Sequence, residues 1–419
     1  MKKIKSIIDV VEYQLCTGCG MCAYIEPLRF EMLDSLEYGK RPFLIEKCVD
    51  ETGEALAVCP GIHLKRENNI DNDENIISEL SDGWGNVYSV WEGYAADEEI
   101  RLSGSSGGAS TVLALYCLEK GIANGVIHTS ADENIPYINK TVLSKNRHDL
   151  LKSVGSRYSP ASPAEGLKFV ADKAEKYVFV GKPCDIAAVH NAKKIRPELD
   201  KHIPIRIGFF CAGVPSLEGN INLLKNNGVN DLSSLKSLNY RGNGWPGLWR
   251  ASFFDKGKCK TVTKTYSESW GYLQKFRQWR CYICPDHTGE FSDISVGDPW
   301  YRDVLPNEQG KSLIVARTKR GLELIEAAAK DGYLILESKN YKLLPGSQPN
   351  LLLTKGTVWA RLLMLRLFGA PFPKYQGFVF FKYWLTQLTI KDKAQSVYGT
   401  VKRIFIKKLH SRIKIEKYK

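Results

Sequence analysis

The chain has 419 residues, of which 43% are hydrophobic and 25% are charged, values that are ordinary for a folded protein and unlike those of a disordered one. Its net charge of +13 is concentrated at one end, because the segment from Lys391 to Lys419 holds ten lysines and arginines against two acids. The rest of the chain is close to neutral, which argues against a nucleic-acid groove and favours an appended contact surface.

The start of the chain is basic, but it has neither an apolar stretch of signal-peptide length nor a small-residue cleavage site. We therefore expect a cytoplasmic protein. Eleven cysteines in such a protein indicate metal binding or catalysis, because the cytosol keeps thiols reduced. Composition divides the chain into residues 1–66, rich in cysteine; 67–83, an acidic linker or surface helix; 84–345, the core; and 346–419, an apolar and basic C-terminal extension.

The first cysteines follow a bacterial iron–sulfur motif that loses its last ligand. Cys16, Cys19 and Cys22 fit C-x2-C-x2-C-x3-C-P, but Glu26 stands where the fourth cysteine belongs. In a two-cluster ferredoxin that fourth cysteine ligates the other cluster, so its loss concerns a second cluster only.

The fourth ligand of the remaining cluster is expected downstream, at Cys59, which is followed by Pro60. Cys48 begins the degenerate second motif and is left without a ligand role. A structural zinc site is the alternative, but zinc prefers two C-x-x-C pairs. The sequence thus predicts one 4Fe-4S cluster in a ferredoxin-type domain, on the ligands Cys16, Cys19, Cys22 and Cys59.

Residues 84–345 alternate short β-rich runs with helical stretches, the pattern of an α/β or α+β domain. Strands are expected over 176–181, 203–210 and 312–318. A helix is expected over 109–121, with Ser105 or Ser106 as its cap and Gly121 as its stop.

Four further cysteines lie in this core. Cys184 and Cys211 each follow a predicted strand, and two strands of a parallel sheet would deliver both sulfurs to one edge. Cys281 and Cys284 form a C-x-x-C pair. Alone, this pattern leaves open buried thiols, zinc, a redox pair or a second cluster.

Two glycine-rich loops are candidates for cofactor binding. GNGWPG (242–247) matches G-x-G-x-x-G, but Pro246 and the lack of a preceding βαβ strand make it a false match for a dinucleotide site. LSGSSGGAST (102–111) leads directly into the predicted helix, so its free backbone N–H groups form either a phosphate cradle or a tight capping turn.

The C-terminal extension has apolar runs that charged residues and prolines interrupt, and none reaches the roughly 20 residues that a membrane-spanning helix needs. We expect it to pack on the body or on a partner, or to lie on a membrane surface. A location at the inner face of the membrane is therefore an alternative to a free cytoplasmic one.

Six stretches together resemble one family, the beta subunits of coenzyme F-420 hydrogenases and dehydrogenases. With the N-terminal cysteine motif they cover roughly residues 10 to 320, and they occur in the family's order: LSGSSGGASTVLALYCLEKGI, SVGSRYSPAS, YVFVGKPCDIAAV, GFFCAGVPS, YRGNGWPG and CYICPDHTGEFSDISVGDPW.

The resemblance implies a flavoprotein with FAD and two 4Fe-4S clusters, in an α/β core that follows a small ferredoxin-like domain. It assigns the second cluster to Cys184, Cys211, Cys281 and Cys284, and FAD contacts to Ser106, Gly107, Gly108, Ser156, Arg157, Tyr158, Pro183, Asp293, Gly297 and Asp298. His287, beside Cys284, and Lys182, beside Cys184, are catalytic candidates as proton donors, and Arg157 could hold an anionic group. A packing role for His287 and cofactor contacts for Lys182 and Arg157 remain alternatives.

We therefore expect electrons to pass from a ferredoxin-like donor or coenzyme F-420 through the clusters to FAD, and on to an unidentified small-molecule substrate. Members with such a C-terminal extension are associated with cell-surface polysaccharide biosynthesis. One alternative is a non-catalytic electron-transfer subunit that docks on a partner enzyme. Another is a zinc-dependent nucleic-acid binder, against which the near-neutral body counts.

Overall fold

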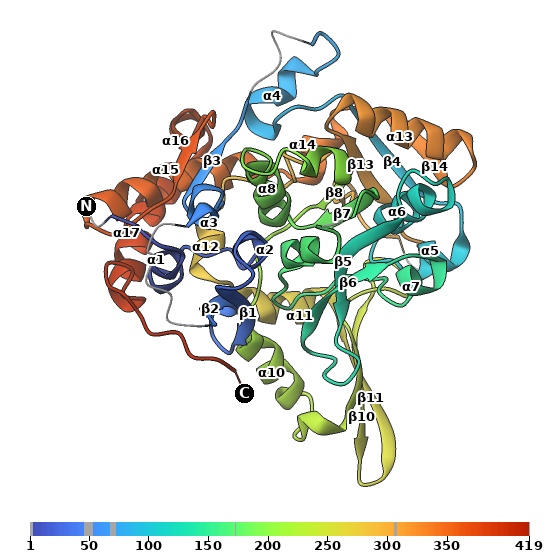
Figure 1. Ribbon diagram of the computed structural model, residues 1–419, viewed down its shortest axis with the longest axis horizontal. Helices are drawn as coiled ribbons and strands as arrows, with labels where there is room; N and C mark the ends of the chain where they lie inside the picture. Colours follow the sequence, from blue (N-terminus) through green and yellow to red (C-terminus); the bar gives the residue numbers. More distant parts are fainter. Residues whose placement is uncertain (1–2, 46–52, 68–72, 172, 306–307, 419) are drawn as a thin grey trace.

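The computed structural model describes residues 3–45, 53–67, 73–171, 173–305 and 308–418. Cys48 lies outside these residues. An eight-stranded mixed sheet forms the centre, in the order β14-β4-β13-β12-β8-β7-β5-β6 (Figure 1). The strands are β4 (Ser89–Ala95), β5 (Gly125–Ala131), β6 (Asn139–Ser144), β7 (Tyr177–Gly181), β8 (Ile205–Phe209), β12 (Ile294–Gly297), β13 (Ser312–Ala316) and β14 (Leu334–Lys339).

The four central strands β12, β8, β7 and β5 are parallel, and antiparallel strands complete the sheet on both sides. Most of their side chains are apolar on both faces, as expected for strands that helices cover on both sides. Ile127 and Phe179 pack beneath α8, whereas Val178 and Ile207 pack beneath α6 and α13. The α/β class that the sequence predicts is confirmed. The core helices are α5 (Glu98–Ser103), α6 (Ala109–Glu119), α7 (Arg147–Leu151), α8 (Pro183–Ala192), α9 (Leu199–His202), α10 (Leu217–Asn226), α11 (Tyr266–Leu273), α12 (Trp279–Tyr282) and α13 (Lys319–Lys330).

The predicted helix over 109–121 is α6, and the three predicted strands are β7, β8 and β13. The predicted cap of α6 was wrong. Its N-cap is Gly108, in a left-handed conformation with φ 72° and no side-chain cap bond. Ser105 Oγ instead accepts the N–H of Ser156 at 2.5 Å, so the serine ties two loops together.

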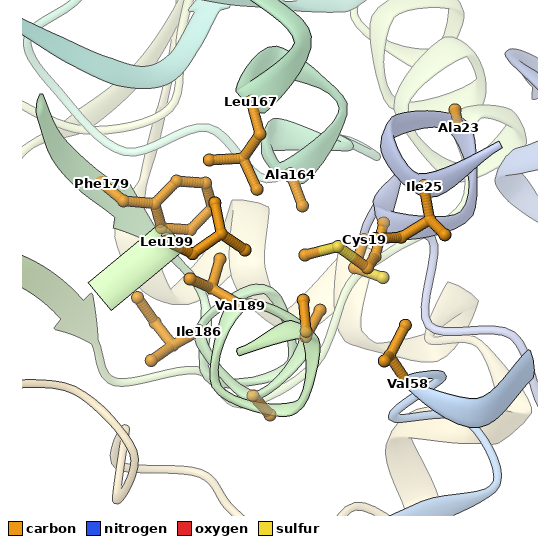
Figure 2. Packing of buried hydrophobic residues seen from close by; sticks show 14 of the residues in the cluster. Cys19, Ala23, Ile25, Val58, Ala164, Leu167, Phe179, Ile186, Val189 and Leu199 are labelled. Atoms are coloured by element: carbon orange, nitrogen blue, oxygen red, sulfur yellow. The ribbon is translucent and has the colours of Figure 1, made fainter. Parts of the chain in front are cut away.

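The N-terminal unit consists of α1 (Ile7–Glu12), α2 (Met21–Ile25), β1 (Phe30–Ser35), β2 (Gly39–Leu44), α3 (Glu54–Ala57) and β3 (His63–Lys65). It shares a hydrophobic cluster with the core. Figure 2 shows Cys19, Ile25 and Val58 of this unit facing Leu167 and Val189 of the core. The unit is therefore built into the body.

The chain then runs through α4 (Ser78–Trp84), which buries Leu80 and Trp84, to β4. A separate antiparallel sheet of β9 (Leu235–Asn239), β10 (Leu248–Asp255) and β11 (Lys258–Thr265) projects from the body (Figure 1). The GNGWPG loop joins β9 to β10, which pair antiparallel. It is not the turn of a βαβ unit, so the interpretation as a false match is confirmed.

The C-terminal extension is helical and lies beside the N-terminal unit (Figure 1). Its strand β15 pairs in parallel with β3, and the N–H of Ile413 donates to the carbonyl of Glu12 at 3.1 Å. In the described part of the chain, no helix combines the length and the apolar character that crossing a membrane requires. The elements are α14 (Leu343–Ser347), α15 (Leu351–Leu367), β15 (Lys374–Gln376), α16 (Phe380–Gln387) and α17 (Ile390–Ile406).

Candidate functional site

The first cysteine set, Cys16, Cys19, Cys22 and Cys59, lines a single small pocket. The loop after α1, the helix α2 and the end of α3 bring the four residues there. The N–H of Gly18 points at Cys16 Sγ at 3.4 Å, and backbone N–H groups of Met21 and Gly61 reach the sulfurs of Cys19 and Cys59. Such N–H···S bonds stabilise thiolates that ligate iron.

Glu26 has a structural task at the position where the sequence motif loses its cysteine. Its Oε1 accepts the N–H of Ala55 at 2.9 Å, so the carboxylate caps the start of α3. This capping stabilises a helix N-terminus, and α3 carries the chain into Cys59. Glu26 therefore stabilises the helix that leads to Cys59, the predicted fourth ligand.

The second cysteine set, Cys184, Cys211, Cys281 and Cys284, is also brought together. Cys184 lies in α8 just after β7, and Cys211 follows β8, the parallel neighbour of β7. Cys211 interacts electrostatically with Cys281, and Cys184 with Cys284. The N–H of Val214 donates to Cys281 Sγ at 3.4 Å.

The cysteines of both sets are buried or partly buried. Burial raises the pKa of Cys19 to about 11 and the pKa values of Cys211 and Cys284 to about 12. Metal coordination supplies the positive charge that such thiols need in order to ionise. Among the described residues, no three Cys, His, Asp or Glu side chains close around a single metal ion. The fit to iron–sulfur groups rests on four sulfur donors and backbone N–H groups at each set.

A cavity of about 600 Å³ opens at the carboxyl ends of β7, β8 and β12, where α/β sheets bind their ligands. The glycine-rich loop before α6 forms one wall, and Cys211 of the second cysteine set forms another. The candidate residues that line this cavity are Ser106, Gly108, Ser156, Arg157, Tyr158, Lys182, His287, Gly297 and Asp298.

Three candidate FAD contacts do not line it. Gly107 faces the sheet, where a methyl group would lie 2.7 Å from the backbone nitrogen of Ser312. Pro183 is buried as the first residue of α8. Asp293 is fully buried in an ion pair with Arg206 at 2.9 Å and a second with Arg320 at 2.6 Å, so its carboxylate braces β8 and α13.

Lys182 and His287, the two catalytic candidates, are both poorly suited to donate a proton. Lys182 Nζ donates to Asp185 at 2.6 Å and to the carbonyl of Ala161 at 3.1 Å, and the pair raises the lysine's pKa despite its burial. Burial lowers the pKa of His287 to about 4, and its Nδ1 donates to the carbonyl of Cys211 at 2.9 Å. At neutral pH the imidazole is uncharged, and Nε2 is a proton acceptor.

Arg157 is also committed to the protein. Its guanidinium donates to Asn139 Oδ1 at 2.8 Å and to the carbonyls of Leu238 and Pro136. These bonds join the loop after α7 to β6 and β9. The side chain therefore shapes the cavity wall and retains little capacity for an anion.

The sequence did not reveal an aromatic wall on the far side of the cavity. Trp300 stacks on Tyr266, with ring centroids 5.7 Å apart, and Arg241 lies over Tyr266 at 4.8 Å. Asp298 accepts two bonds from Arg241, at 2.7 and 2.8 Å, which fix this wall. The sequence DPW around Asp298 was the available signal.

The C-terminal extension also contributes to the cavity, through Ser347, Gln348, Asn350 and Thr354 at the junction of α14 and α15. No motif in the sequence signalled this contribution. The extension is therefore part of the site's wall.

Two family models match the chain over most of the core. Residues 90–168 match the N-terminal region and residues 174–342 the C-terminal region of the coenzyme F420 hydrogenase/dehydrogenase beta subunit. The chain belongs to this family. Its first 89 residues and the elements from α14 onward lie outside both matched regions.

The coenzyme F420 hydrogenase subunit beta of Methanosarcina barkeri is 25% identical over 245 residues, which span 57% of this chain and 77% of that protein. One of the subunits of the F(420)H(2) dehydrogenase of Methanosarcina mazei is 23% identical over 338 residues, 76% of this chain and 89% of its own.

A chain of the F420-reducing NiFe hydrogenase complex from Methanosarcina barkeri superposes with a TM-score of 0.51. It covers 66% of this chain and 92% of its own length, at 23% identity. The likeness extends the family relationship to the fold of the core.

Proposed function

We propose that the protein is an iron–sulfur flavoprotein oxidoreductase that moves electrons between a ferredoxin-like donor or coenzyme F420 and a small-molecule substrate. The observation that carries the proposal is the position of Cys211, which belongs to the second cysteine set and also lines the cavity. A cluster on that set and a ligand in the cavity would be neighbours, as electron transfer requires.

The residues of the cavity fit FAD. Gly104, Gly108 and the serines between them put backbone N–H groups without bulky side chains at the start of α6, which suits a pyrophosphate. The aromatic wall of Tyr266 and Trp300 suits a planar ring. Bound FAD would convert between the single electrons of clusters and two-electron chemistry.

Lys182 and His287 line the cavity beside the second cysteine set and would determine which groups there carry protons. Lys182 holds its proton, because its ammonium group donates to both carboxylate oxygens of Asp185 and to the carbonyl of Ala161. His287 accepts a proton at Nε2, because its Nδ1 is held by the carbonyl of Cys211.

The test is anaerobic purification followed by analysis of iron, sulfide, zinc and flavin in one sample. We expect about eight irons and one FAD per chain, since each 4Fe-4S cluster carries four irons. About four irons would remove one cysteine set from the proposal. Zinc without flavin would contradict the oxidoreductase function.

A second function is favoured by the names of the relatives, which are described as subunits of larger enzymes. In that case the chain is an electron-transfer subunit, and a partner enzyme carries the chemistry. Stopped-flow mixing of the dithionite-reduced protein with small-molecule acceptors distinguishes the two functions. An oxidoreductase is reoxidised and releases product on its own, whereas an electron-transfer subunit turns over only after the partner enzyme is added. The link to cell-surface polysaccharide biosynthesis stays a prediction.

The C-terminal extension supports a membrane-surface contact as part of the proposal. Its helices pack on the body through Leu365 and Ile404, which share a hydrophobic cluster with Val10 and Leu15 of the N-terminal unit. They also expose Ile390 (86%) and Phe405 (57%) among lysines. Exposed apolar side chains next to lysines suit an anionic bilayer surface.

A further inference from the structure

Two buried arginines link the two cysteine sets reciprocally. Arg41 comes from β2 of the N-terminal unit and Arg280 from α12 of the core, and they are 2% and 5% exposed. Each guanidinium reaches a residue of the other unit that is next to a cysteine-bearing segment. Nothing in the sequence patterns of the two cysteine sets requires either arginine.

Arg41 lies against the loop between the first two cysteines. Its Nη1 donates to the carbonyl of Lys40 at 2.7 Å and lies 3.3 Å from where a side chain at Gly18 would begin. Its Nη2 donates to Gln278 Oε1, the residue that opens α12. The guanidinium interacts electrostatically with Cys16 and Cys19 of the first set and with Cys281 of the second.

Arg280 makes the opposite connection. Its Nη2 donates to the carbonyl of Pro60 at 3.1 Å, directly after Cys59. It interacts electrostatically with Cys59 and also with Cys184, Cys281 and Cys284. Both sets therefore share the field of both guanidiniums.

These charges lack the usual compensation. Within the described ranges, neither arginine forms an ion pair with a carboxylate, and the Nε atoms of both are buried without a hydrogen-bond partner. A buried, uncompensated cation is strongly destabilising. An anionic group bound by the neighbouring cysteines would compensate these two positive charges. A 4Fe-4S cluster with four thiolate ligands is such an anionic group.

We propose that Arg41 and Arg280 are positioning residues that compensate the charge of both clusters and raise their reduction potentials together, which matches the two clusters for electron exchange. This inference rests on the proposed function, because it needs clusters on both sets. An added electron makes a cluster more negative, and a fixed cation nearby stabilises that reduced form. The protein's contribution is the placement of two charges between two centres.

The test is a potentiometric titration followed by electron paramagnetic resonance on anaerobically purified protein. The variants are Arg41→Gln, Arg280→Gln, Arg41→Lys and Arg280→Lys. The control is Arg147→Gln, because Arg147 pairs with Asp97 and Glu99 at the surface of the core. At the wild-type midpoint potential, we expect each Gln variant to lower the reduced-to-oxidised ratio of both clusters about tenfold, which corresponds to a shift of about 59 mV for a one-electron couple. The Lys variants should recover most of this shift, and Arg147→Gln should leave both potentials unchanged.

Iron content separates the outcomes. Unchanged potentials in Gln variants with full iron would overturn the inference and leave the proposed function standing. Loss of iron in the Gln variants but not in the Lys variants would support the charge role of the arginines. Loss of iron in both kinds of variant would show that the arginines act by packing, and would overturn the inference. A wild-type protein without clusters would overturn the proposed function itself.

Discussion

Arg66 Nη1 lies 3.0 Å from Glu290 Oε2, and both side chains are almost completely withdrawn from water. Lys355 of α15 contacts the other oxygen of the same carboxylate. Arg66 follows β3 of the N-terminal unit and Glu290 precedes β12 of the core. One buried carboxylate thus joins the N-terminal unit, the core and the C-terminal extension.

Replacing Glu290 by Gln should lower the free energy of unfolding by about 3–5 kcal/mol, because two buried cations lose their anion. Urea denaturation at pH 7 measures the change. Asp255→Asn is a suitable control, since its pair with Lys260 is exposed and should contribute under about 1 kcal/mol. A Glu290→Gln protein as stable as the wild type would contradict a structural role for the triad.

The same carboxylate predicts a pH dependence. Burial alone would raise the pKa of Glu290, but Lys355 and Arg66 outweigh it and hold the pKa below its usual value. Its contribution to stability is therefore complete above the unfolded pKa of about 4.3 and is lost as the pH falls through the lower folded value. Between pH 6 and pH 3, the free energy of unfolding should therefore decrease more steeply for the wild type than for Glu290→Gln, as urea denaturation at each pH would measure.

Replacing Cys59 by Ser should remove about four irons per chain and leave the second cluster in place, because each set supplies four ligands to one cluster. Iron and sulfide analysis with electron paramagnetic resonance measures both. Cys117→Ser is the matched control, since that thiol is buried in α6 among aliphatic side chains. Equal iron loss in the two variants would show that folding, and not ligation, is responsible.

Replacing Cys211 by Ser should remove about four irons and also alter the flavin spectrum, because this residue lines the cavity. Absorbance and fluorescence of the flavin report the second effect. The corresponding Cys22→Ser variant should lose the same amount of iron with an unchanged flavin spectrum. A flavin spectrum that responds equally to both variants would contradict the placement of FAD in the cavity.

Replacing Gly107 by Ala should reduce bound flavin, since a methyl group there would lie 2.8 Å from the carbonyl of Gly93 and would displace the cradle loop. Flavin released by denaturation gives the occupancy, and we expect a fall of at least about threefold, the effect of about 0.7 kcal/mol. Gly271→Ala in α11 is the control, because nothing lies within 4 Å of its added methyl group.

Replacing Ile390 and Phe405 together by Ser should weaken co-sedimentation with anionic liposomes about tenfold, as expected for two partly buried apolar side chains. Phe254→Ser is the control, since Phe254 is exposed on the distant β10. Point substitutions are preferable to deleting the tail, because Arg412 pairs with Asp9 of α1. Unchanged binding would exclude this surface as the membrane contact.

The sequence was sufficient for the class of the fold, the central strands and α6, because each is a strongly apolar run of the right length. The structure brings the members of each predicted cysteine set close to one another, and their role as cluster ligands stays a prediction. The sequence failed at Gly107 and Asp293, where a conspicuous residue serves packing or an ion pair. It could not reveal Arg41, Arg280 or the cavity residues of the C-terminal extension, because those contacts join segments that are distant along the chain.

The pairing of β15 with β3 also has a consequence for biosynthesis. The ribosome makes β3 early, but its partner strand β15 emerges on the order of half a minute later at typical elongation rates. The packing of the N-terminal unit is therefore completed only after the whole core has been synthesised.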